Sequence, residues 1–265
     1  MSRYKQTDKT FEFNSLRDLV TEAKSVPDTL YLAAMDDRQM LSHGREWAGK
    51  DTWRDLCDMC YRGDKSLVGA AEKLLDQISI NVETPEREWR TEPVGWFPLV
   101  PATIAGHPED MRRLHHTQSD TNPVTIWTDS TTSAGISSDD MLKRGTAILA
   151  LVMKLQRVRP VNLIQCSLFS DKLLTVKHDT QPLNLATVTY ALTNPGFTRR
   201  ILYHTLQPQD FGRVNFSEAK MRQRLGHRVK PADLVIPGVM LGDELIKDGV
   251  KWVQHQLDRL MKVGD

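Results

Sequence analysis

The chain has 265 residues, of which 40% are hydrophobic and 26% charged, and its formal net charge at pH 7 is only +1. This length and apolar content suffice for one large hydrophobic core. No run of residues approaches the roughly 20 apolar positions that a membrane-spanning helix needs, and the polar N-terminus lacks the apolar segment of a secretory signal. We therefore expect a soluble protein that makes no membrane contact, in which any nucleic-acid binding depends on a local basic patch.

Residues 14–80 have a helical pattern. Residues 15–23 place apolar side chains at helical spacing after Ser15, which is a suitable N-cap, and residues 64–75 follow Gly63 with a second amphipathic run. Cys57 and Cys60 have the spacing of a redox or zinc pair, but no second pair accompanies them. We interpret them as semi-buried structural cysteines.

Residues 81–122 are dense in proline, which blocks long helices and central strands. We predict a wrapping connection here, with short helical turns near Ala102 and Met111. A connection of this length is often functional. Residues 1–122 are thus predicted to form an N-terminal helical and proline-rich wrapping region, and residues 123–265 an α/β domain.

The α/β domain begins with a βαβ unit. An apolar strand at 124–127 ends in a polar loop, an apolar-striped helix follows at 138–158 with Ser138 as its cap, and a second apolar strand occupies 161–169. Such units are nearly always right-handed and parallel. The loop at 129–135 therefore lies at the carboxyl end of a strand, where sheets of this kind usually bind ligands.

The remaining elements complete a mixed sheet. The turn at 170–172 is too short for a crossover, so residues 173–177 should pair antiparallel with the preceding strand and form one edge of the sheet. Helices at 183–192 and 196–206, a basic helix near 217–225, a strand at 233–236 and a closing helix at 243–261 follow. We predict about four strands from the C-terminal half, with the N-terminal helices packed on or beside them.

This order of elements resembles the von Willebrand factor A fold, a Rossmann-like architecture. In that family an Asp-x-Ser-x-Ser loop, a downstream threonine and a later aspartate hold a divalent cation. The resemblance assigns Asp129, Thr131 and Ser133 to the loop and Thr187 to the threonine position. The later aspartate is missing, because the last strand is followed by Pro237 and Gly238. We therefore expect no bound metal and no cofactor, and the loop fits equally well as a polar turn with capping hydroxyls.

A second resemblance rests on residues 106–111, 143–147 and 194–200. These phrases are similar to a family of uncharacterised proteins encoded by tailed bacteriophages. In the N4-like group, a protein of this character binds single-stranded DNA and recruits the phage RNA polymerase. The resemblance implies the cytoplasm of an infected bacterial host, and a phage RNA polymerase or another phage protein as partner.

A basic segment carries the functional signal in the residues themselves. Residues 197–230 hold eight cations against two acids, and four aromatic residues are interleaved with them. Cations bind phosphates, and aromatic faces stack on bases. The predicted nucleic-acid-binding residues are Arg199, Arg200, Arg213, Lys220, Arg222, Arg224, Arg228 and Lys230. A solvated face whose aromatic residues point inward is the competing interpretation.

Two functions from different classes fit these observations. The first is a phage-encoded, non-enzymatic accessory that binds single-stranded DNA and recruits a protein partner in transcription. The second is a von Willebrand A-like protein-interaction module that does not bind DNA and acts with or without a divalent cation. The chain contains no phosphate-binding loop, nucleophile elbow or complete metal-ligand set, so we expect no enzymatic activity.

Overall fold

The structure is a computed structural model that describes residues 4–7, 10–25, 52–65, 68–77, 87–94, 97–116, 122–132, 136–169, 172–178, 184–206, 232–239 and 242–261. Its strands are β1 (Tyr4–Thr7), β2 (Thr10–Phe13), β3 (Arg87–Glu92), β4 (Phe97–Pro98), β5 (Met111–His116), β6 (Val124–Asp129), β7 (Val161–Phe169), β8 (Lys172–His178) and β9 (Leu234–Ile236). Its helices are α1 (Leu16–Ser25), α3 (Trp53–Arg62), α4 (Val68–Gln77), α5 (Val100–Ile104), α6 (Ser138–Leu155), α7 (Leu185–Thr193), the π-helix η1 (Phe197–Leu202), α8 (Tyr203–Leu206), α10 (Glu244–Lys247) and α11 (Gly249–Met261).

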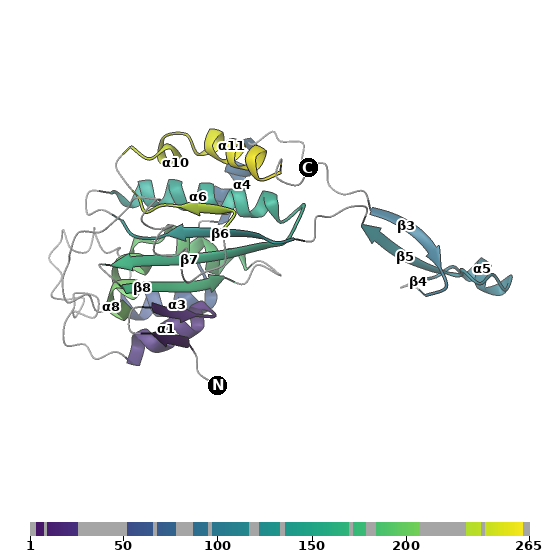
Figure 1. Cartoon of the computed structure of the whole chain (residues 1–265), viewed down its shortest axis with the longest axis horizontal. Helices are drawn as coiled ribbons and strands as arrows, with labels where there is room; N and C mark the ends of the chain where they lie inside the picture. The colour runs from purple at the N-terminus through teal and green to yellow at the C-terminus, as the bar shows by residue number, and fades with distance from the viewer. Residues whose placement is uncertain are drawn as a thin grey trace.

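A mixed six-stranded sheet with the order β1-β2-β8-β7-β6-β9 forms the centre of the molecule (Figure 1). β6 is parallel to β7 and β9, β8 is antiparallel to β7, and β2 is parallel to β8. The predicted mixed α/β fold and its four C-terminal strands are confirmed. The prediction that residues 173–177 form an edge strand is wrong, because β2 pairs with the other side of β8. β2 has only four residues, which gives too short a pattern to predict a strand pairing across the whole chain.

The N-terminal residues share this sheet instead of forming a unit of their own. β1 and β2 extend it, α1 packs on β2 and β8, and α4 packs on α6. The prediction that the N-terminal helices pack on or beside the sheet is therefore confirmed. The predicted boundary at residue 122 does not separate two packing units, because chain segments on both sides of it contribute strands to one sheet.

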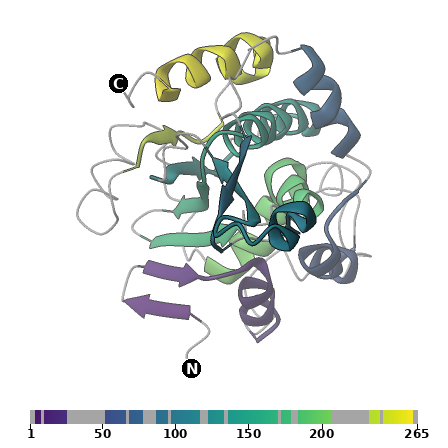
Figure 2. The same ribbon diagram turned by 90° about the vertical axis from the view of Figure 1, so that its right-hand side faces the viewer.

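The described helices that pack on the main sheet lie on one of its faces, as the view turned by 90° shows (Figure 2). Alternate residues of each strand point to that face. In one core, Ile126 and Leu163 pack with α6, α7 and α11, and in the other, Phe13 and Val176 pack with α1, α3 and η1. A smaller buried cluster around Trp127 lies on the opposite face. Both large cores thus lie between the helices and the same face of the sheet.

Helix α6 is the longest helix described and contributes its buried apolar residues to the core that contains Ile126 and Leu163. Its N-cap is Ser137, whose hydroxyl accepts the backbone N–H of Asp140 at 3.1 Å, so the cap lies one residue before the predicted Ser138. Gly145 lets α6 approach α7 closely, because a Cβ atom at this position would lie 2.5 Å from the backbone oxygen of Leu192. The predicted closing helix is divided at Asp248 into α10 and α11.

Residues 87–116 form a projecting arm instead of a wrapping connection. Its described part is a three-stranded sheet of order β3-β5-β4 with the short helix α5, and it extends away from the main sheet (Figure 1). The helical turn predicted near Ala102 is confirmed as α5, but the turn predicted near Met111 is wrong, since Met111 begins β5. The prolines lie where they do not interrupt a central strand: Pro98 is in the edge strand β4 and Pro101 is in the first turn of α5.

None of the helices that the structure describes is both long enough and apolar enough to cross a membrane.

Candidate functional site

The candidate site lies at the edge of the sheet where β6, β7 and β9 end. These strands are parallel, so their carboxyl ends meet at the same edge. The backbone N–H of Val239, beyond β9, donates to the carbonyl oxygen of Thr131, beyond β6, at 2.9 Å. The backbone N–H of Ser130 donates to the carbonyl oxygen of Cys166 at 2.7 Å. Short backbone hydrogen bonds therefore fix the start of the loop that follows β6.

Asp129 ends β6 and is buried. Its Oδ1 atom accepts the backbone N–H of Thr131 at 2.9 Å and the Thr131 hydroxyl at 2.5 Å. Burial raises the pKa of Asp129 to about 6, against the opposing effects of the Thr131 hydrogen bonds and the nearby Arg144. The carboxylate thus closes a local turn, and within the described residues its Oδ2 atom has no hydrogen-bond partner.

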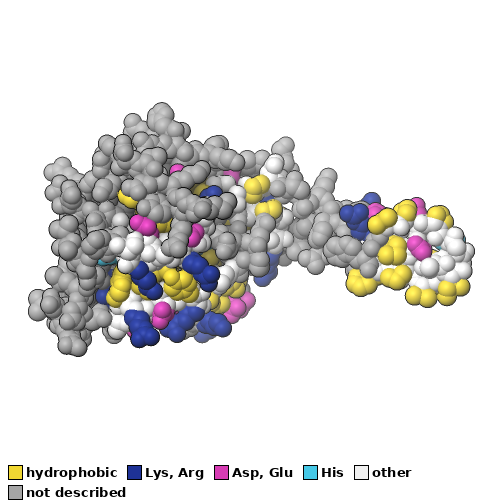
Figure 3. Space-filling view, turned by 90° about the horizontal axis from the view of Figure 1, so that it is seen from below, with side chains coloured by type: hydrophobic (Ala, Val, Ile, Leu, Met, Phe, Trp, Pro, Cys, Tyr) yellow, Lys and Arg dark blue, Asp and Glu magenta, His cyan; other side chains and the backbone are white. Residues whose placement is uncertain are grey.

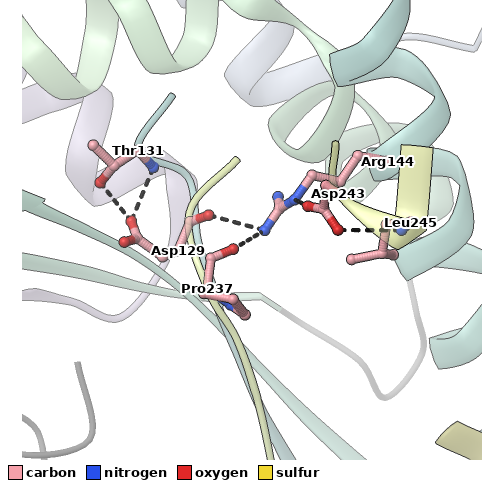
Figure 4. A network of polar contacts seen from close by, with 6 residues as sticks. All are labelled: Asp129, Thr131, Arg144, Pro237, Asp243 and Leu245. Atoms are coloured by element: carbon pink, nitrogen blue, oxygen red, sulfur yellow. Dashed lines mark hydrogen bonds and ion pairs between the residues drawn. The ribbon is translucent and has the colours of Figure 1, made fainter. Parts of the chain in front are cut away.

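Arg144 of α6 links three loops at this edge (Figure 4). Its Nη2 atom donates to the carbonyl oxygens of Asp129 at 3.2 Å and Pro237 at 2.6 Å, and its Nε atom lies 3.8 Å from Oδ2 of Asp243. Asp243 also accepts the backbone N–H of Leu245 at 3.1 Å, at the start of α10. Burial lowers the pKa of the Arg144 guanidinium, and Asp243 and Asp129 counteract that shift. Arg144 is therefore a buried tie between β6, β9 and α10.

A second group of hydrogen bonds is centred on Gln165, next to the contacts of Arg144. Gln165 of β7 donates from Nε2 to the hydroxyl of Ser130 and, at 2.8 Å, to the carbonyl oxygen of Ala191. Its Oε1 atom accepts a 2.9 Å hydrogen bond from Nε2 of His178. Burial lowers the pKa of His178 to about 4, so the ring is neutral at pH 7. A neutral histidine that donates to an amide, not to a hydroxyl, does not activate Ser130 as a nucleophile.

The space inside the site is small. A cavity of about 10 Å³ lies among side chains of both polar networks, which is close to the volume that one water molecule requires. Its lining residues are Ser130, Thr132, Met141, Arg144, Gln165, Leu192, Thr198 and Val239. Among the described residues, the arrangement holds loops in place, and this cavity is too small for an organic substrate.

The cation site implied by the von Willebrand A resemblance is not assembled among the described residues. Thr187 lies in the first turn of α7, where its hydroxyl donates to the carbonyl oxygen of Asn184 at 3.1 Å, so its assignment to the threonine position is wrong. The threonines that line the cavity beside Ser130 are Thr132 and Thr198. Ser133 lies outside the described residues. The guanidinium of Arg144 beside Asp129 also opposes a divalent cation by charge repulsion.

Among the described residues, other reactive side chains do not form a second candidate site. Over the part of the chain that the structure describes, no group of three His, Cys, Asp or Glu side chains is positioned to hold a metal ion. Cys57, Cys60 and Cys166 are buried and form no disulfide. Cys57 and Cys60 are thus more deeply buried than the predicted semi-buried pair. Burial raises the pKa of Cys57 to about 11, which disfavours a reactive thiolate.

Two of the eight predicted nucleic-acid contacts are corrected by the structure. Arg199 is 2% exposed and Arg200 is 1% exposed, and both belong to the buried helix η1. Arg199 donates from Nη2 to the carbonyl oxygen of Ile136 at 2.8 Å. Neither side chain is exposed for a phosphate contact, because η1 packs against apolar neighbours in the core. The other predicted contacts, Arg213, Lys220, Arg222, Arg224, Arg228 and Lys230, lie outside the described residues.

The structure reveals a basic and aromatic surface that the sequence analysis missed. Tyr61 of α3 is 40% exposed, and the guanidinium carbon of Arg17 and the Nζ atom of Lys24 lie 5.6 Å and 5.5 Å from its ring centroid. We call α1 and α3 with these three side chains the α1–α3 surface. Figure 3, which views the molecule from below Figure 1, shows Lys and Arg side chains gathered on this face of the body. Arg17 and Lys24 are seven residues apart, which is one helical face, but only the packing of α1 on α3 brings Tyr61 to them.

The basic segment begins beside this surface. Helix α8, which ends at Leu206 directly before residue 207, packs against α1. Within α8, the His204 ring contacts the Trp53 ring of α3 edge-to-face, with centroids 5.2 Å apart. The chain therefore leaves the described core at residue 206 next to α1 and α3.

The chain belongs to a family described as "Domain of unknown function (DUF7192)", whose match covers residues 4–262. Neither the curated proteins nor the solved structures contain a significant match to the chain.

Proposed function

We propose that this protein is a non-enzymatic accessory that binds single-stranded DNA through the α1–α3 surface together with residues 207–230, the part of the basic segment that follows α8. The observation that supports this most is the exposed Tyr61 ring with Arg17 and Lys24 close by, at the place where α8 leads into that segment. A single-stranded site needs cations for phosphates and an aromatic face for bases. The protein combines both without a net charge that would attract nucleic acid over its whole surface.

The charge distribution supports this proposal. Residues 207–230 contain six Lys or Arg residues and two acidic residues, whereas the whole chain carries a net charge of only +1. On the α1–α3 surface, two of the acidic side chains are engaged at helix N-termini. Asp18 accepts the Ser15 hydroxyl at 2.9 Å, and Asp55 accepts the Thr52 hydroxyl at 2.7 Å. Arg54 and Arg62 are exposed on the same helix as Tyr61.

The bacteriophage resemblance supplies the biological setting of the proposal. In that setting the protein acts in the cytoplasm of an infected host, and its protein partner is a phage RNA polymerase or another phage protein. Among the described residues around Asp129, hydrogen bonds to Thr131 and Arg144 hold the loops in place around a cavity of about 10 Å³, which supports an accessory over an enzyme.

The test is a fluorescence-anisotropy titration of a labelled single-stranded oligonucleotide at salt concentrations between about 50 and 200 mM. Replacing Arg222 and Arg224 together with alanine should weaken binding and reduce the salt slope by roughly one to two units, since each lost phosphate contact contributes a little under one. The matched control is the double variant Arg157→Ala/Lys177→Ala, which removes two exposed cations from other parts of the molecule.

Separate variants test whether Tyr61 stacks on a base. Tyr61→Ala should weaken binding by roughly 5- to 150-fold, because stacking on one base contributes about 1–3 kcal/mol, while Tyr61→Phe retains the ring and should bind nearly as the parent does. Equal affinities of the parent and all of these variants, or a salt slope near zero, would contradict DNA binding by this surface.

The alternative function, a von Willebrand A-like interaction module acting through the Asp129 loop, has weaker support. Oδ1 of Asp129 is engaged by Thr131, and Arg144 occupies the adjoining space. The module would be favoured if the protein bound no oligonucleotide while Asp129→Ala abolished binding to its protein partner.

A further inference from the structure

The far end of the arm exposes apolar side chains. Residues 93–108, which we call the arm tip, lie between β3 and β5 and include β4 and α5. Four large hydrophobic residues of the arm tip, from the turn after β3, from β4 and from α5, are exposed by 73%, 59%, 59% and 82%: Val94, Phe97, Val100 and Ile104. Figure 3 shows hydrophobic side chains at several places around the end of the arm. An exposed apolar concentration of this kind marks a contact with a protein or a membrane.

The arm tip carries no charged residue, whereas the part of the arm behind it carries both signs. Residues 93–108 contain no Lys, Arg, Asp or Glu. Exposed Arg112 lies opposite Phe97 in the β4–β5 register, so the boundary between the uncharged tip and the charged part passes through this pair. Behind it, the charged side chains that the structure describes are three cations and three acids: Arg90, Arg112, Arg113, Glu92, Glu109 and Asp110.

This order of layers matches a phospholipid surface. The boundary of the hydrocarbon region accepts uncharged apolar side chains, and a zwitterionic headgroup layer offers a phosphate to each arginine and an ammonium group to each carboxylate. Nucleic acid fits this end of the arm less well, because as many acids as cations stand behind the tip. A protein partner would need a surface shaped to the projecting end, whereas a fluid bilayer accepts a projecting apolar end of any outline.

We propose that the arm tip inserts into the headgroup–acyl boundary of a zwitterionic phospholipid bilayer. The arm extends away from the main sheet, so the tip can enter the lipid while the body stays outside it (Figure 1). The expectation of no membrane contact rested on the lack of a membrane-spanning segment, which peripheral insertion does not require. The proposal is independent of DNA binding, because the α1–α3 surface is not part of the arm.

The test is flotation of the full-length protein with phosphatidylcholine vesicles. We expect the protein to float with the vesicles, and about 0.5 M salt should not release it, because salt screens charge contacts and not apolar insertion. Ile104→Asp should weaken partitioning at least about tenfold, because it places a charge at the hydrocarbon boundary. The matched control is Met261→Asp on α11, which changes another exposed hydrophobic residue and should float as the parent does. Ile104 is 82% exposed, so its variant should unfold at the parent temperature.

A fluorescent label shows which part of the protein enters the lipid. Cys57, Cys60 and Cys166 are buried, so a single introduced surface cysteine can be labelled selectively. A polarity-sensitive label on Ala105→Cys, in the arm tip, should shift to shorter wavelengths with vesicles and be quenched by brominated lipid. The same label on Ser25→Cys, an exposed position at the end of α1, should do neither.

Four results would overturn the proposal. The first is a parent protein that does not float at about 1 mM lipid, where even a marginal anchor is mostly bound. The second is flotation that Ile104→Asp does not weaken, and the third is flotation that salt abolishes. The fourth is a parent protein that self-associates in sedimentation velocity and that Ile104→Asp returns to the monomer, which would assign the tip to a protein contact. Oligonucleotide affinity is measured without vesicles, so failure here is distinct from failure of the DNA-binding proposal.

Discussion

Arg144 and Asp129 are joined by a hydrogen bond of 3.2 Å between the guanidinium Nη2 and the backbone carbonyl oxygen, which ties α6 to the end of β6. Arg144→Ala would leave this carbonyl and that of Pro237 without their donor and would remove the charge partner of Asp243. We expect the free energy of unfolding to fall by roughly 2–4 kcal/mol, measured by urea titration. The neighbouring exposed Lys143, replaced with alanine, should change it by less than about 0.5 kcal/mol. Equal losses for both variants would show that the buried tie does not stabilise the fold.

Gly145 and Gly69 offer a matched pair of helical glycines. A Cβ atom at Gly145 would lie 2.5 Å from the Leu192 backbone oxygen, whereas a Cβ atom at Gly69 would meet nothing within 4 Å. Gly145→Ala should therefore lower the free energy of unfolding by about 1–3 kcal/mol through overpacking. Gly69→Ala should raise it by roughly 0.5–1 kcal/mol, because alanine favours the helix. Chemical denaturation of the two variants checks this, and changes of the same sign would argue against close packing of α6 on α7.

His178 should make stability depend on pH below neutrality. Burial lowers its pKa to about 4 from the usual value of 6.5, so the unfolded chain binds the proton more tightly. The stabilisation is present above pH 6.5 and is lost as the pH falls towards 4, by up to roughly 3 kcal/mol. Replacing His178 with glutamine should flatten the pH dependence of the free energy of unfolding in this window. An unchanged slope would mean that His178 ionises as readily in the folded protein as in the unfolded chain.

Asp129 acts in the opposite direction over part of the same range. Burial raises its pKa to about 6 from the usual value of 3.8, so its contribution to stability is present below pH 3.8 and is lost as the pH rises through 6. Asp129→Asn removes this opposing effect. Between pH 6 and 4, the variant should therefore lose more stability on acidification than the parent protein does. A shallower loss in the variant would contradict the raised pKa.

The Asp129 loop should hold no tightly bound divalent cation. Arg144 places a permanent positive charge beside the carboxylate, and Thr187 lies in the first turn of α7. Thermal unfolding with and without millimolar magnesium or manganese should give the same midpoint, because a ligand stabilises a protein only if it binds the folded state. A stabilisation that Asp129→Ala abolishes would show that the loop binds the metal.

Local patterns in the sequence determined the type and order of most elements. The apolar runs of β6 and β7, the apolar stripe of α6 and the short turn before β8 each depend on residues close together in the chain. These patterns therefore predict the βαβ unit and the hairpin correctly. The polar loop after β6 was likewise placed at the carboxyl edge of the sheet, where the Asp129 network is found.

Tertiary packing decided which side chains are displayed and which strands are neighbours. The adjacent arginines Arg199 and Arg200 were predicted to contact phosphates, yet both are buried because the apolar residues of η1 pack in the core. β8 became an internal strand because β2, about 160 residues earlier in the chain, pairs with it. Tyr61 lies beside the cations Arg17 and Lys24 only because α1 packs on α3. A local pattern specifies an element, whereas exposure and strand order depend on contacts between residues far apart in the chain, which no local pattern encodes.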